Sequence, residues 1–269
     1  VSGPPVCVIR KSALDSSQGA GGHPASLLQH QMQNHAERMN ALTRLQSLRN
    51  RVLPALAILL FALLLLWIIL APSESRLGNL VKLVFVHGAL VWSGLLAFSV
   101  AGALGLMALA ARHVLGPIAA AARMHAPVLY RGTAAAGLGA LIVWIAYVIS
   151  SMAVTGLTWG QVIAWNEPRV QATGLILLAA LVLYVVARLV ANDEFTALVS
   201  VLMGIVPWIV VNQAGVIRHP VDPIGGSESA AIQTYYGLIL LTVVALALTL
   251  IAWLWTGAEL KANPAENNE

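Results

Sequence analysis

The sequence predicts an all-α polytopic membrane protein with six transmembrane helices and both termini in the cytoplasm. Of its 269 residues, 59% are hydrophobic and only 10% are charged, and the mean hydropathy is +0.81. Several apolar runs reach the roughly 20 residues that a helix needs to cross a bilayer. These runs do not alternate between apolar and polar residues, so they do not fit the strands of a membrane β-barrel.

The N-terminal part, residues 1–51, precedes the first expected span. Residues 1–31 are rich in Ser, Gly, Pro and His without periodicity, and they are expected to be disordered. From Arg38 to Arg51, four arginines have three leucines between them, which predicts a short amphipathic cytoplasmic helix leading into the membrane. Translation is expected to begin at an internal methionine, with a native flexible tail as the alternative; the candidate starts are Met32 and Met39.

Six spans are expected within residues 52–256, followed by a cytoplasmic tail over residues 257–269. The spans cover about 52–71, 80–111, 128–153, 170–191, 195–215 and 235–256. The connection over residues 154–169 contains two of the eight tryptophans and is expected to form an external loop. Trp rings favour the headgroup level of a bilayer, so this loop is predicted to be an interfacial platform.

The distribution of Lys and Arg predicts the orientation. With a cytoplasmic N-terminus, nine cationic residues flank the cytoplasmic side and only four flank the outer side, as the positive-inside rule requires. The nine are Arg38, Arg44, Arg49, Arg51, Arg112, Arg123, Arg131, Arg188 and Lys261, and the four are Arg76, Lys82, Arg169 and Arg218. The expected location is the inner, cytoplasmic membrane of a bacterium or an organelle.

Two histidines fall on the expected outer side. His87 lies about two turns into the second span, and His219 follows the fifth. Imidazole is a common axial ligand of haem iron, apolar and Trp side chains cover a porphyrin face, and Arg pairs with propionates. The same side carries the Trp platform and two arginines, an arrangement that would suit a bound haem. The single cysteine excludes covalent attachment through C-x-x-C-H.

These residues resemble the haem-handling membrane proteins of cytochrome c maturation, CcmC and its relatives in the CcsA group. That family has a helix beginning near V-H-x-x-x-x-W, an external W-G-x-x-W-x-W-D segment followed by a basic residue, and a second external histidine. The resemblance covers roughly residues 55–256. The matching residues are Val86-His87 with Trp92, Trp159-Gly160 and Trp165 with Arg169, and Pro207 with His219-Pro220.

The chain departs from the family pattern inside the tryptophan-rich segment. Val162 and Ile163 stand in its middle, Asn166 follows the last Trp in place of an acid, and Glu167-Pro168 precedes Arg169 as an apparent insertion. A flatter, less aromatic platform follows from these changes. We therefore expect weaker or more static haem retention than the resemblance alone implies.

The resemblance implies a non-covalent, b-type haem with His87 and His219 as its metal ligands. The other residues that it implies for the cofactor site are Trp92, Trp159, Trp165, Arg169 and Arg218. It further implies haem transport or delivery for cytochrome c-type biogenesis, without enzymatic catalysis. The implied partners are haem, a periplasmic haem chaperone, ABC transporter subunits and the lipid bilayer, with no nucleic acid.

A different class stays open: a structural or accessory subunit of a larger membrane electron-transfer complex that has lost haem handling. The small residues Gly102, Gly105, Gly132, Gly137 and Gly139 would then serve helix packing within and between subunits. A zinc site is the weaker metal hypothesis, because the outer side offers two histidines and scattered carboxylates. A permease is disfavoured because ionisable groups at mid-membrane depth are lacking.

Overall fold

The computed structural model describes residues 24–115, 120–218 and 224–263. It separates into two units, residues 1–44 and residues 45–269. In the first unit the described residues belong to α1 (Pro24–Ser47). This helix begins within the stretch expected to be disordered, because proline suits a first helical turn and good helix formers follow it. All features below belong to the second unit.

Six helices among the described residues are long and apolar enough to cross a membrane, which confirms the predicted all-α polytopic class. The described residues contain no strand. The six helices are α2 (Leu53–Leu70), α3 (Val81–Leu109), α4 (Ala120–Trp159), α5 (Pro168–Val190), α6 (Asp193–Gln213) and α7 (Ala230–Ala262). π-Helical segments at Leu48–Val52 and Ala110–Leu115 precede α2 and follow α3.

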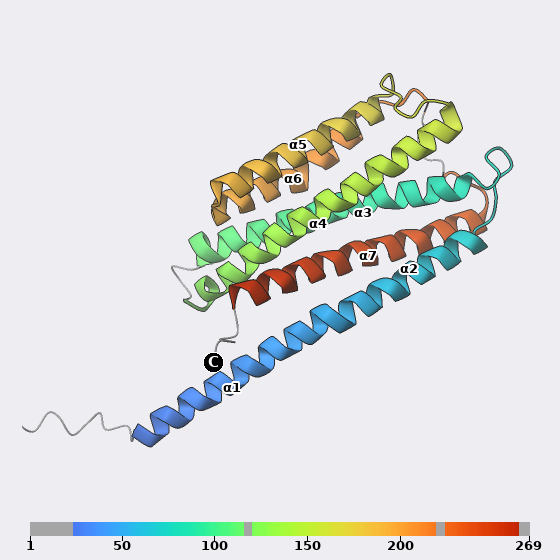
Figure 1. Cartoon of the computed structure of the whole chain (residues 1–269). Helices are drawn as coiled ribbons and strands as arrows, with labels where there is room; N and C mark the ends of the chain where they lie inside the picture. The colour runs from blue at the N-terminus through green and yellow to red at the C-terminus, as the bar shows by residue number, and fades with distance from the viewer. Residues whose placement is uncertain (1–23, 116–119, 219–223, 264–269) are drawn as a thin grey trace, which may run out of the picture. The chain divides into compact units, whose positions relative to one another are not determined.

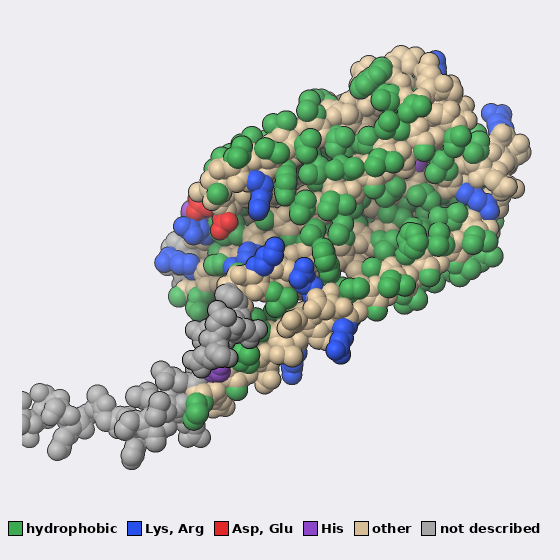
Figure 2. All heavy atoms as spheres, in the orientation of Figure 1, with side chains coloured by type: hydrophobic (Ala, Val, Ile, Leu, Met, Phe, Trp, Pro, Cys, Tyr) green, Lys and Arg blue, Asp and Glu red, His purple; other side chains and the backbone are tan. Residues whose placement is uncertain are grey.

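Large apolar side chains cover the flanks of the bundle, as the space-filling view in Figure 2 shows. Ile58, Ile149, Leu189 and Leu241 are all more than 60% exposed. Contiguous apolar surface of this kind is unfavourable in water and is the expected surface of a helix bundle in lipid.

Two helices extend further than the sequence predicted. α4 runs to Trp159, so the connection expected over 154–169 covers only Gly160–Glu167. The helix ends where Gly160 adopts φ +70°, a conformation that favours glycine. α7 runs to Ala262, so residues 257–262 are helical rather than part of a tail, and Gly257 is buried.

α3 lies at the centre and packs on α4, α6 and α7. Its glycines permit close approach: a Cβ at Gly94 would lie 2.7 Å from the Trp144 ring, and one at Gly105 would lie 2.7 Å from the Ala197 carbonyl oxygen. Trp144 is fully buried against Phe98, with ring centroids 5.8 Å apart. Small residues thus bring the helix backbones together, as in many membrane bundles.

The connections between the helices divide between two ends of the bundle (Figure 1). We call the end that carries the α2–α3, α4–α5 and α6–α7 connections the loop end. We call the other, which carries the α3–α4 and α5–α6 connections, the turn end. The loop end is the expected outer side, and the turn end is the expected cytoplasmic side.

Candidate cofactor site at the loop end

His87 is half-buried on α3 and faces α4. Its Nδ1 lies 3.2 Å from the hydroxyl oxygen of Ser150, and its ring centroid lies 5.0 Å from that of Tyr147. The Ser150 hydroxyl donates its proton to the Tyr147 carbonyl at 2.7 Å, so its oxygen is left to accept from His87. With that oxygen as the acceptor, Nδ1 carries the proton when the imidazole is neutral.

That tautomer suits ligation of a metal through Nε2. Ligating imidazoles commonly donate their other N–H to an oxygen, which fixes the orientation of the ring and raises its basicity. Ser150 supplies such an oxygen from the neighbouring helix. Through this contact Ser150 holds the His87 ring in position.

Tyr147 is in turn fixed between α4 and α5. Its hydroxyl lies 2.9 Å from the Thr173 hydroxyl, and the indole N–H of Trp144 donates to the Thr173 carbonyl at 3.3 Å. Tyr147, Trp144 and Thr173 are all at least 93% buried. The wall beside His87 is therefore buried and hydrogen-bonded.

The connection between α4 and α5 folds back onto the helices. The Thr155 hydroxyl donates to the Val162 carbonyl at 2.8 Å, and the Gln171 side-chain amide donates to the Trp165 carbonyl at 2.6 Å. Trp159, the last residue of α4, is half-buried, whereas Trp165 is 65% exposed. Trp159 follows Ser150 by nine residues, or about 13 Å along the axis, so His87 lies deeper than the tryptophans.

Glu167 joins this connection to the segment after α6. Its carboxylate is 1% exposed and accepts the backbone N–H groups of Ile217 at 3.2 Å and Arg218 at 2.8 Å. Such charge-assisted bonds to a buried carboxylate are strong. Arg169, two residues further along, is half-buried at the start of α5. Arg169 and Arg218 thus lie at the same end of the bundle.

His219, the second expected ligand, lies outside the described residues. The chain on either side of it is anchored: Glu167 binds residues 217 and 218, and the Gln233 side chain donates to the carbonyls of Gly225 and Ser227 at 3.2 and 2.8 Å. Glu167 lies six residues before Thr173, or about 9 Å along α5. Thr173 in turn contacts Tyr147, the tyrosine beside His87.

Trp92 does not face the same space as His87. The two residues are five apart in a helix, which separates them by about 140° around its axis. The Trp92 ring packs on Trp208 of α6, with centroids 5.7 Å apart, and the Trp208 indole donates to the Ser99 hydroxyl at 2.8 Å. The structure therefore gives Trp92 a packing contact between α3 and α6.

The sequence did not predict three residues of this site: Ser150, Tyr147, and Glu167 in its role of anchoring the backbone before His219. The first two share a spacing of three residues, which places them on one face of a helix, and this was the available signal. The pairing of that face with α3 was not available from the sequence. For Glu167, the only indication in the sequence was its place as a single acid directly before a proline that starts a helix.

The described residues form an all-α membrane-spanning bundle whose loop end presents an oriented imidazole beside a tyrosine and below a tryptophan-containing connection. Among those same residues, no group of three or more His, Cys, Asp and Glu side chains is placed to hold a metal ion. No protein-family model and no curated protein matches the chain.

Proposed function

We propose that this chain is a CcmC-like membrane protein that binds haem at the loop end and takes part in its delivery for cytochrome c biogenesis. The observation that carries the proposal is the orientation of His87. Its Nδ1 donates to Ser150, which holds the ring against α4, and a neutral imidazole held in this way suits an axial bond to haem iron.

In this proposal haem is the cargo, held non-covalently and as b-type. His87 and His219 supply the axial nitrogens, and Trp159 and Trp165 cover the porphyrin. Arg169 and Arg218 pair with the propionates, since planar guanidinium groups bind carboxylates in bidentate fashion. The protein makes and breaks no covalent bond in the cargo, so its activity is positioning and handover. A haem chaperone and ABC transporter subunits are the proposed partners.

The optical spectrum of the purified chain, alone and after addition of haemin, tests the proposal. A Soret band is expected, and His87→Ala is expected to shift or abolish it by removing one axial ligand. His219→Ala should do the same. His113→Ala and His125→Ala are the controls, because both residues lie towards the turn end and should leave the spectrum unchanged.

The positioning role of Ser150 adds a second readout. Ser150→Ala removes the oxygen that accepts from His87 and should lower haem retention several-fold while the band remains, since the ligand itself is intact. A spectrum unaffected by His87→Ala would overturn the proposal. A stable multi-subunit complex without haem would favour the accessory-subunit hypothesis instead.

That alternative expected the glycines to pack helices within and between subunits. Gly102 and Gly204 meet backbone to backbone, Gly132 lies under Trp255, and Gly139 lies under Ile251. These small residues are used in packing within the chain.

A further inference from the structure

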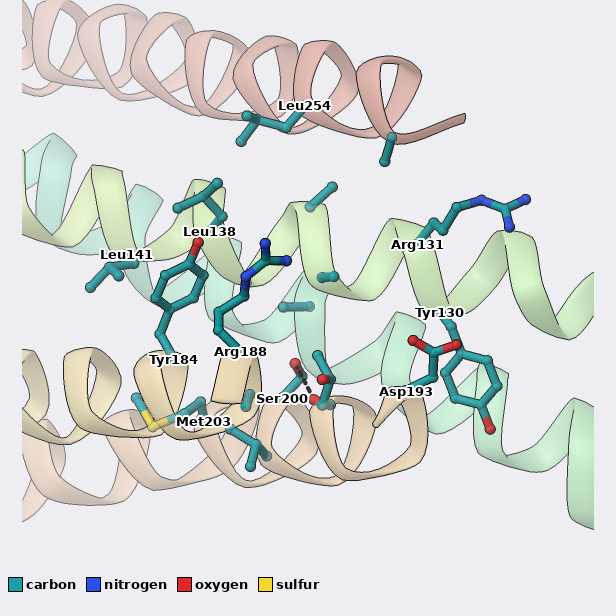
Figure 3. Close-up of a pocket in the computed structure, with 18 of the residues that line it drawn as sticks. Tyr130, Arg131, Leu138, Leu141, Tyr184, Arg188, Asp193, Ser200, Met203 and Leu254 are labelled. Carbon is teal, nitrogen blue, oxygen red and sulfur yellow. Dashed lines mark hydrogen bonds between the residues drawn. The ribbon is translucent and has the colours of Figure 1, made fainter. Parts of the chain in front are cut away.

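A cavity of about 750 Å³ lies towards the turn end, in the half of the bundle opposite the proposed haem site. Figure 3 shows α4 crossing it, with α7 on one side and α5 and α6 on the other. α5 packs on α4 and α6, and α7 packs on α2, α3 and α4. The cavity therefore lies along α4, between the α5–α6 pair and α7.

Four cationic side chains and one carboxylate line this cavity: Arg49, Arg131, Arg188, Lys261 and Asp193. Arg131 is neutralised by Glu259, which accepts from its Nε at 2.9 Å and its Nη2 at 2.8 Å. Arg188 and Lys261 are exposed and make no hydrogen bond or ion pair with any residue that the structure describes. The lining thus carries positive charge that the described part of the chain does not neutralise.

Arg49 adds a third cation in a fixed position. Its guanidinium carbon lies 4.9 Å from the centre of the Trp253 ring, and the group lies directly against Gly257, where a Cβ would be 3.0 Å from Nε. The Arg49 Nε is buried without a hydrogen-bond partner among the described residues. A cation held over an aromatic face keeps donors available for an anion.

The rest of the lining is mostly apolar and lies deeper in the bundle. Leu138 and Leu141 follow Arg131 on α4 by seven and ten residues, or about 10 and 15 Å along the axis. In Figure 3, Arg188 and Tyr184 rise side by side from α5 towards α4, with Leu254 of α7 facing them across the space. Arg188 and Lys261 lie near the ends of α5 and α7, and these cations with apolar walls beyond them match the depth profile of a lipid headgroup and its acyl chain.

We propose that this cavity binds an anionic phospholipid, with its phosphate at Arg49, Arg188 and Lys261 and one acyl chain along Leu138, Leu141 and Leu254. Basic pockets between transmembrane helices near the membrane surface are suited to such headgroups. The volume is in the range of small-molecule sites. A soluble anion would use the cations but leave the apolar walls uncovered, so the lining favours a lipid.

Retention of spin-labelled phosphatidylglycerol by the full chain in phosphatidylcholine nanodiscs tests the proposal. The wild-type chain is expected to immobilise phosphatidylglycerol in preference to spin-labelled phosphatidylcholine. Arg188→Ala/Lys261→Ala should lower this preference at least tenfold, and Arg188→Lys/Lys261→Arg should restore it. Arg51→Ala is the matched control, because Arg51 is exposed at the same end but does not line the cavity.

Leu138→Trp tests the acyl-chain part separately, because it fills the cavity and leaves the cations in place. It should displace the lipid. A thermal unfolding measurement checks that the variant is folded. Equal immobilisation of phosphatidylcholine would overturn the proposal. Full displacement by inorganic phosphate, or unchanged retention in both the double alanine variant and Leu138→Trp, would overturn it as well. None of these outcomes depends on haem, so failure here and failure of the haem proposal are distinguishable.

Discussion

The carboxylate of Glu167, at the start of α5, accepts the backbone N–H of Arg218, 51 residues further along the chain, at 2.8 Å. A second backbone N–H, from Ile217, reaches the other carboxylate oxygen. The side chain is 1% exposed, so these two amides replace the water that would otherwise solvate the charge. Through them, Glu167 fixes the backbone directly before His219.

Glu167→Gln should destabilise the bundle by about 2 kcal/mol. The amide of Gln keeps the shape of the side chain but loses the charge, and its NH₂ group faces a backbone N–H donor. Because a hydrogen bond to a charged group is worth about 1.5–3 kcal/mol, the loss should be of that size. Hydrogen exchange at Ile217 and Arg218 should accelerate. Under the haem proposal the same variant should also retain haem less tightly.

Glu228→Gln is the matched control, since Glu228 is exposed in the same α6–α7 connection. It should change the free energy of unfolding by less than about 0.5 kcal/mol. Equal exchange rates at residues 217 and 218 in wild type and Glu167→Gln would show that the carboxylate is not the anchor.

Two glycines should respond oppositely to alanine. A Cβ at Gly105 would lie 2.7 Å from the Ala197 carbonyl oxygen, which belongs to the backbone of α6 and cannot yield cheaply. Gly105→Ala should therefore cost about 1–3 kcal/mol. At Gly174 in α5 nothing lies within 4 Å, so Gly174→Ala should stabilise by up to about 1 kcal/mol through helix propensity. Thermal unfolding in the same detergent compares the two, and a stabilising Gly105→Ala would contradict the α3–α6 packing.

The two ion pairs at the turn end should differ in strength. Arg131 and Glu259 are 28% and 14% exposed and form a bidentate pair, whereas Arg112 and Glu194 are 55% and 40% exposed. Double-mutant cycles on the free energy of unfolding should give about 1–3 kcal/mol of coupling for the first pair and less than about 1 kcal/mol for the second. A coupling for Arg112–Glu194 as large as that for Arg131–Glu259 would refute this difference.

Hydrophobic run length alone was enough to predict the six spanning helices, because membrane-spanning backbone must satisfy its own hydrogen bonds. The predicted ends were less accurate. α4 continues six residues past the expected end of its span, to Trp159, and α7 six residues past its own, to Ala262. Apolarity marks where a helix enters lipid, whereas the helix ends where a backbone feature such as Gly160 stops it.

The candidate site, too, was predicted only in part from the sequence. His87 could be selected from the sequence because an ionisable group at membrane depth is rare. Ser150, which orients it, and Glu167, which anchors the chain before His219, act through contacts across 63 and about 50 residues of sequence. Spacing along the chain carries no information about such contacts. Trp92 matched a motif by its spacing, but that spacing did not predict that its ring packs on Trp208.

The orientation of the bundle is the last prediction, and it rests on nine cationic residues expected at the cytoplasmic side against four outside. With Cys7 changed to Ser, single cysteines placed at Ser75, Gln161 and Ser227 in the loop-end connections should react with a membrane-impermeant maleimide added to intact cells. Ala121→Cys at the turn end should react only after permeabilisation. The reverse pattern would place His87 and the proposed haem site at the cytoplasmic end. Delivery of haem to the outer side would then lose its geometric basis, and the basic cavity would face the outer leaflet. Ser75, Gln161 and Ala121 are exposed and Ser227 is half-buried, so each label reports the side of one end of the bundle without entering its core.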